Sequence, residues 1–120
     1  MAGVETRSFE SPDDTRTPDK TKLEIVNVGG RIVGRGTLQP GWRWSEAIKP
    51  LVGTDSCEVH HLGVLLSGRM HVVHNDGSEG DVAPGEVYNI QAGHDAWVVG
   101  DEPVVAIEFD PSAVETFAKT

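Results

Sequence analysis

From Lys22 onward, short runs rich in Val, Ile and Leu alternate with turns that contain Gly or Pro, at a spacing of roughly ten residues. This spacing constrains the fold most, because runs of this length predict strands and are too short for periodic helices. The runs lie at residues 23–28, 31–38, 42–44, 64–66, 70–74, 87–90, 96–99 and 104–109. Tight turns favour antiparallel neighbours, and closing the sheet removes its exposed edges. The sequence therefore predicts an all-β, antiparallel β-barrel.

The two ends of the chain differ from this pattern. Residues 1–21 are polar, include Pro12 and Pro18 and have no apolar period, so we expect a flexible N-terminal arm. Residues 22–120 fit one domain, since 120 residues leave little for a second core. A short C-terminal helix is predicted over 111–119, where Pro111 suits a first helical turn. Residues 45–50 form a connection or a single helical turn.

Charge and composition limit the binding partners and the cellular location that we expect. Asp and Glu total 19 against 10 Lys and Arg, a formal charge of −9 with no basic cluster, so nucleic acid is not expected as a partner. No stretch approaches the apolar length of a membrane helix, and we expect no membrane contact. The N-terminus is charged where a secretion signal would be apolar, and Cys57 has no cysteine to pair with. The expected location is cytoplasmic.

Three side chains are candidate metal ligands: Cys57, His61 and His94. Thiolate and imidazole suit Zn, Fe, Ni or Cu better than Mg or Ca. On one continuous strand Cys57 and His61 would lie about 13 Å apart, at ~3.3 Å per residue. A shared metal therefore requires the chain to turn near residues 58–60. The alternative is a small buried thiol and solvated or hydrogen-bonded histidines.

Other features are less specific. His60 and His61 are adjacent and should point to opposite faces of a strand. On 70–74, His74 is expected to face inward if Met70 and Val72 do. Trp42 and Trp44 share a face of the predicted strand 42–44, which suits core packing, a subunit contact or an apolar pocket. No GxSxG, phosphate-loop or HExxH motif is present.

Two segments within residues 35–110 resemble the two motifs of a cupin domain. The first, DSCEVHHLGVLLSGRMHV, begins at Asp55. Counting back from Gly68 by the family spacing puts His61 at the family's glutamate position. Cys57 and Asp55 then fall at the two histidine positions that precede it.

The second segment, GEVYNIQAGHDAWVV, begins at Gly85. It resembles the second cupin motif, with Gln91 where proline is usual in the turn. The family histidine position corresponds to Ala96, and His94 comes two residues earlier. The resemblance is closest to small single-domain bacterial cupins of unassigned activity.

The resemblance implies a cupin-type barrel, also called a double-stranded β-helix or jelly roll, and it supplies the turn required between Cys57 and His61. None of the four usual family ligands is present at its usual position and type. Cys57, His61 and His94 are substitutes that could form a rearranged site for one divalent transition metal.

Three functions remain open at this point. The first is a metal-dependent enzyme that acts on a small molecule through an open coordination position. The second is a small-molecule-binding or sensor module without metal, which the loss of the usual ligands favours. An interaction scaffold ranks third.

Two further expectations concern which side chains near His94 point into the barrel and which point out of it. If His94 points inward, strand alternation places Trp97 and Val99 on the outer face, where an apolar patch predicts a homodimer. The strand 23–28 could also pair across subunits. Asp95 faces away from His94, and is expected to serve a turn or cap rather than a metal.

Overall fold

The structure is a computed structural model that describes residues 3–109. Most of this range is strand, and the described helices are two short ones between the third and fourth strands. The elements are β1 (Asp14–Arg16), β2 (Thr21–Val28), β3 (Arg31–Leu38), α1 (Trp44–Ala47), α2 (Lys49–Val52), β4 (His61–Ser67), β5 (Met70–His74), β6 (Glu79–Val82), β7 (Val87–Ile90), β8 (His94–Val98) and β9 (Val104–Glu108).

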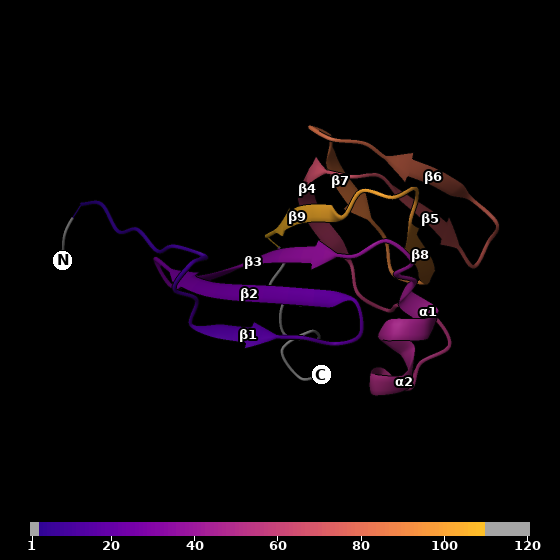
Figure 1. Cartoon of the computed structure of the whole chain (residues 1–120), viewed down its shortest axis with the longest axis horizontal. Helices are drawn as coiled ribbons and strands as arrows, with labels where there is room; N and C mark the ends of the chain where they lie inside the picture. Colours follow the sequence, from indigo (N-terminus) through magenta and orange to yellow (C-terminus); the bar gives the residue numbers. More distant parts are fainter. Residues whose placement is uncertain (1–2, 110–120) are drawn as a thin grey trace.

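The strands form two antiparallel sheets, which confirms the predicted fold class. The larger sheet has six strands in the order β1-β2-β3-β9-β4-β7, and the smaller has three in the order β6-β5-β8. Figure 1 shows the β2–β3 hairpin extending away from the barrel, whereas α1 and α2 lie near β8. Gly29 and Gly30 make the hairpin turn, both with positive φ, which matches the twist of the strands they join. The crossovers between the sheets give a jelly roll.

The core lies between the inner faces of the two sheets. Along β8 and β9 every second residue is buried, the alternation expected of strands with one solvent-facing side. Leu65 of β4, Val104 of β9 and Ile48, between the two helices, are the most fully enclosed large side chains among the described residues. Trp42 and Trp44 join the same core.

The short helices correct the sequence prediction in one place. Residues 42–44 were expected to form a strand, but only Arg43 makes a bridge, to Trp97, and Trp44 begins α1. Asp95 of β8 explains the change, because its Oδ1 accepts a hydrogen bond from the Ser45 backbone N–H at 3.1 Å. A carboxylate at a helix N-terminus stabilises the unpaired N–H groups there. The expected capping role of Asp95 is thereby confirmed.

The N-terminal segment departs from the expected arm. Asp14–Arg16 form β1 and pair with β2 in register Asp14↔Ile25. β3 pairs with one edge of β2 along its whole length and β1 pairs with residues 23–25 on the other edge, so most of the strand 23–28 is unavailable for pairing across subunits. The predicted C-terminal helix, 111–119, lies outside the described residues. Within residues 3–109, no helix is long and apolar enough to cross a membrane.

The homodimer remains a prediction, now with a different surface. Trp97 is covered by Arg43, whose guanidinium carbon lies 4.1 Å from the ring centroid. The outer faces of β4 and β7 instead expose Leu62 (44%), Leu66 (51%) and Val87 (73%), an apolar patch of the kind that subunits bury. We expect light scattering to give twice the monomer mass at micromolar concentration. Leu66→Lys combined with Val87→Lys should give monomers, and Leu51→Lys, on exposed α2, should not. A monomeric wild-type chain would contradict the expectation.

Candidate metal centre

Cys57 and His94 are held side by side by backbone hydrogen bonds. They face each other as an isolated antiparallel bridge. The Cys57 N–H donates to the His94 carbonyl at 2.7 Å, and the His94 N–H donates to the Cys57 carbonyl at 3.2 Å. Opposed residues in an antiparallel pair carry their side chains on the same face. The bridge therefore aims the thiol and the imidazole into the barrel together.

His61 reaches the same point from another strand. It is the first residue of β4, and residues 58–60 that precede it belong to no strand. The chain thus turns between Cys57 and His61, as the shared-site hypothesis required. The Cys57 Sγ lies 3.5 Å from the His61 Nε2, far closer than a continuous strand would allow.

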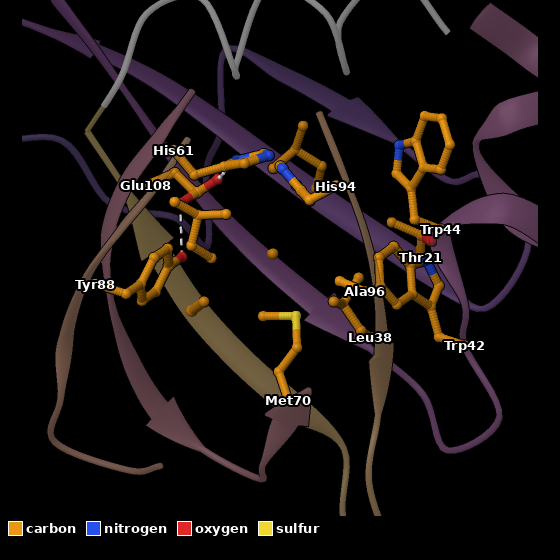
Figure 2. A pocket seen from close by; sticks show the side chains of 14 residues that line it. Thr21, Leu38, Trp42, Trp44, His61, Met70, Tyr88, His94, Ala96 and Glu108 are labelled. Atoms are coloured by element: carbon orange, nitrogen blue, oxygen red, sulfur yellow. Dashed lines mark hydrogen bonds and ion pairs between the residues drawn. The ribbon is translucent and has the colours of Figure 1, made fainter. Parts of the chain in front are cut away.

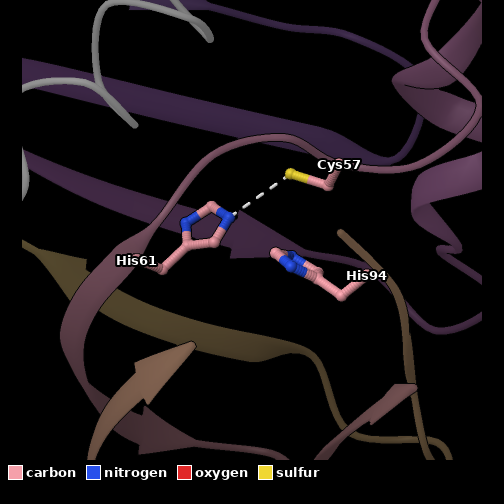
Figure 3. Close-up of side chains that lie close together, drawn as sticks. All are labelled: Cys57, His61 and His94. Atoms are coloured by element: carbon pink, nitrogen blue, oxygen red, sulfur yellow. Dashed lines mark hydrogen bonds between the residues drawn. The ribbon is translucent and has the colours of Figure 1, made fainter. Parts of the chain in front are cut away.

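All three predicted ligands converge, as Figure 3 shows. The ligating atoms of Cys57, His61 and His94 lie within 4.8 Å of one another, and all three residues are buried. The group is the described residues' only cluster of three or more His, Cys, Asp or Glu side chains spaced for a metal. Asp55 and His60, which lie within two positions of these residues in sequence, are not in the cluster.

Each imidazole is oriented by an oxygen on its far side. The His94 Nδ1 lies 2.7 Å from the Gln91 carbonyl, which only accepts, so this nitrogen donates and carries the proton. The His61 Nδ1 donates in the same way to the Glu108 carboxylate at 2.5 Å. Metal-binding histidines are commonly fixed through their second nitrogen like this. Both Nε2 atoms are left as the metal-facing ones.

Glu108 and Tyr88 belong to this site, and the sequence analysis did not single them out. Glu108, from β9, is buried and accepts a second hydrogen bond from the Tyr88 hydroxyl at 2.6 Å. One signal was available: glutamate inside the apolar run VVAIEF breaks its pattern at an inward position. Its partner, forty-seven positions away, could not be read from the sequence.

Gly63 leaves the room in which Tyr88 and Glu108 meet. It pairs with Tyr88 on one side and with Glu108 on the other. A Cβ at position 63 would lie 2.6 Å from the Tyr88 hydroxyl, 2.7 Å from the Glu108 Oε2 and 2.3 Å from the Ile107 carbonyl oxygen. Real Cβ atoms do not approach backbone oxygen so closely, so only glycine fits here.

The site favours a charged thiolate–imidazolium pair when no metal is bound. Burial opposes ionisation of Cys57, but hydrogen bonds from His61 and His94 outweigh it and lower the pKa of the thiol to about 6. Burial likewise lowers the pKa of His61, yet the Cys57 thiolate and the Glu108 carboxylate more than reverse this and raise it to about 10. Burial, with the neighbouring Glu108 charge, also raises the pKa of Tyr88, which keeps its proton and donates.

An apolar cavity of about 70 Å³ adjoins the three ligands. Figure 2 shows Trp42, Trp44, Leu38 and Met70 around one part of it, with the polar group of His61, His94 and Glu108 at another. Of the uses open to Trp42 and Trp44, the structure shows both core packing and an apolar pocket. Ala96, buried on β8 like His94, lines the cavity as well.

Comparison with known proteins identifies the fold. No protein-family model and no curated protein sequence matches the chain. Among solved structures, a sugar phosphate isomerase from the cupin superfamily of Silicibacter pomeroyi aligns with TM-score 0.60 and 16% identity, over 86% of this chain and 73% of that one. A cupin-2 domain protein, Rru_A2000 from Rhodospirillum rubrum, aligns with TM-score 0.53 and 17% identity, over 88% and 65%. The chain has the cupin fold.

Other structural neighbours are proteins of unknown function. A protein of unknown function from Rhizobium leguminosarum aligns with TM-score 0.62 and 20% identity, over 89% of this chain and 95% of that one. At these identities the likeness concerns the barrel and not its chemistry. Within this cupin barrel, the resemblance assigns family ligand positions to Asp55, Cys57, His61 and Ala96, and the structure brings only Cys57 and His61 of these into the cluster.

The first prediction for the site concerns Gly63. Gly63→Ala places a Cβ against backbone oxygen, which cannot move without disturbing β9, and should lower the free energy of unfolding by about 3 kcal/mol. Urea denaturation measures the change. Gly80→Ala, in β6 with open space around its Cα, is the matched control and should change stability little. Equal effects of the two substitutions would show that the close approach at Gly63 carries no constraint.

The second prediction concerns the thiolate. In chelator-treated protein, ultraviolet thiolate absorbance should appear with a midpoint near pH 6, the pKa of Cys57. The lowered pKa of Cys57 stabilises the fold above that pH, and this stability is lost as pH falls through about 6. The raised pKa of His61 stabilises the fold at lower pH, and that contribution is lost as pH rises through about 10. His61→Gln should move the absorbance midpoint upward, and an unchanged midpoint would rule out the pair.

Proposed function

We propose that this cupin binds one divalent transition metal through Cys57, His61 and His94 and acts on a small molecule held in the adjoining cavity. The observation that carries the proposal is the convergence of one thiol and two imidazoles with both Nδ1 atoms already committed to oxygen acceptors. Three protein ligands leave a coordination position open, the pattern of catalytic rather than structural zinc sites. A bound metal would supply Lewis-acid chemistry.

The donor set supports a metal over a simple thiol nucleophile. Cys57, His61 and Glu108 do have the order of nucleophile, base and orienting carboxylate. Such a triad needs only one imidazole beside the sulfur. Here a second imidazole, from His94, is oriented toward the same point by the Gln91 carbonyl. Two oriented imidazoles and a thiolate fit Zn, Fe or Cu, with Ni the fourth metal suited to these donors.

The residues around the proposed metal position would have separate roles. Glu108 holds the Nδ1 proton of His61 and so keeps its Nε2 available to the metal. Tyr88 fixes the Glu108 carboxylate through its second oxygen. The apolar wall of the cavity limits water at the open position, which strengthens electrostatic contacts there.

A metal-free binding or sensor module is the second candidate. The cavity favours it, because apolar walls around a few polar groups are typical of ligand pockets with or without turnover. The two candidates differ in whether metal binding is required.

The test is titration of Zn²⁺ into chelator-treated protein. We expect one ion per chain and release of about one proton between pH 6 and 10, because His61 must lose its proton to bind. Cys57→Ser and His94→Ala should weaken binding at least about 100-fold, and Glu108→Gln about 10–100-fold.

His74→Ala is the matched control. The His74 ring lies 5.6 Å from the His94 ring, but its Nε2 donates to the Gln91 carbonyl and it is not in the cluster. Its loss should leave the affinity unchanged. Equal, weak zinc binding by the wild type and all variants would contradict the metal site and favour the metal-free binding module.

A further inference from the structure

The cavity beside the candidate metal site has a composition that selects its occupant. Of the residues that line it, none is Lys or Arg, and Glu108 is the one carboxylate. Most of the wall is apolar, with the indoles of Trp42 and Trp44 on it. Phosphates and carboxylates are bound in proteins by cationic side chains or clustered N–H donors. This wall offers an anion no Lys or Arg, and its imidazolium, His61, already pairs with the Cys57 thiolate and the Glu108 carboxylate.

The charge balance of the site points the same way. With a divalent ion at the three ligands, the Cys57 thiolate and the Glu108 carboxylate already compensate its two positive charges. A neutral ligand preserves this balance inside the barrel. An anionic ligand would add a buried negative charge without a partner, which is costly in an apolar environment.

The volume of the cavity and one unsatisfied hydrogen-bond donor on its wall limit the occupant further. The volume, about 70 Å³, is several-fold below the roughly 300–1,000 Å³ of pockets for drug-sized ligands, so the occupant is no larger than a single ring. Trp42 is buried, and its indole N–H has no acceptor among the described residues. Buried donors are nearly always satisfied, so this one suits an occupant that brings an oxygen.

We infer that the cavity binds a neutral, single-ring molecule carrying a hydroxyl, with the ring against the apolar wall and the hydroxyl oxygen placed to accept the Trp42 indole N–H. Indole faces stack well on flat rings, and the apolar wall contributes burial energy to the ring alone. The inference names the substrate class of the proposed function and rests on it for the role of the metal. Sugar phosphates are excluded as substrates by the same wall.

The experiment compares phenol, benzoate and phenyl phosphate, which share a ring and differ in charge, on the zinc-loaded protein. Binding is followed by calorimetry and by quenching of tryptophan fluorescence. Phenol should bind at least ten-fold more tightly than either anion, and glucose 6-phosphate should show no saturable binding. Phenol binding no tighter than phenyl phosphate would overturn the inference.

Two variants locate the binding. Ala96→Leu fills the cavity and should weaken phenol binding at least ten-fold, and Ala92→Leu makes the same change in an exposed turn and should not. If Ala96→Leu fails to fold, Leu38→Trp, at another wall position, replaces it. Unchanged phenol affinity in a folded cavity-filling variant would also overturn the inference.

The zinc titration separates this inference from the proposed function. Zinc binding without phenol binding would support the metal site and contradict the proposed class of ligand. Phenol binding by a chain that binds no zinc would keep the ligand class and remove the metal-dependent function.

Discussion

A carboxylate inside an apolar barrel is the constraint on which the interior depends. Glu108 is buried on β9, and a buried charge persists only where hydrogen bonds replace its lost hydration. Its two oxygens are satisfied separately, one by the His61 imidazole and one by the Tyr88 hydroxyl. The pairing of β4 with both β7 and β9 brings the three strands together, and Gly63 between them provides the space. Removing any of these parts would leave a buried polar group unpaired.

This network determines how the ligand group behaves. Because Glu108 accepts the His61 Nδ1 proton, the Nε2 of His61 faces Cys57. The thiolate and the imidazolium then stabilise each other across 3.5 Å in the absence of metal. A metal ion would replace the His61 proton in this arrangement without repositioning the backbone, since the Cys57–His94 bridge is already closed. The site is preorganised by backbone and side-chain hydrogen bonds that already hold all three residues.

The sequence predicted the strands and the ligands better than it predicted what supports them. Periodicity and turn residues located the barrel strands, because these signals are local. Cys57, His61 and His94 could be proposed because thiol and imidazole are rare, chemically distinct side chains. A helical turn over 45–50 was one of two expectations, but the strand expected over 42–44 was wrong, because the hydrogen bond at the start of α1 comes from Asp95, fifty positions from Ser45. The roles of Glu108 and Tyr88 depend on strand order, and neither residue type alone distinguishes a supporting carboxylate from a solvated one.

The displaced histidine and the cavity have a common explanation. By the cupin resemblance, the second-motif ligand would stand at residue 96, where this chain has alanine. His94 lies two residues earlier on β8, on the same inner face and roughly 7 Å along the strand, directly opposite Cys57. Relative to the position that the resemblance implies, the histidine stands one pleat nearer the thiol, and the small side chain of Ala96 lines the cavity. One shift along β8 accounts both for a ligand set of one thiol and two imidazoles and for the apolar space beside it. The departure from the cupin motif that the resemblance implies is therefore consistent with the cluster of Cys57, His61 and His94 beside an apolar cavity.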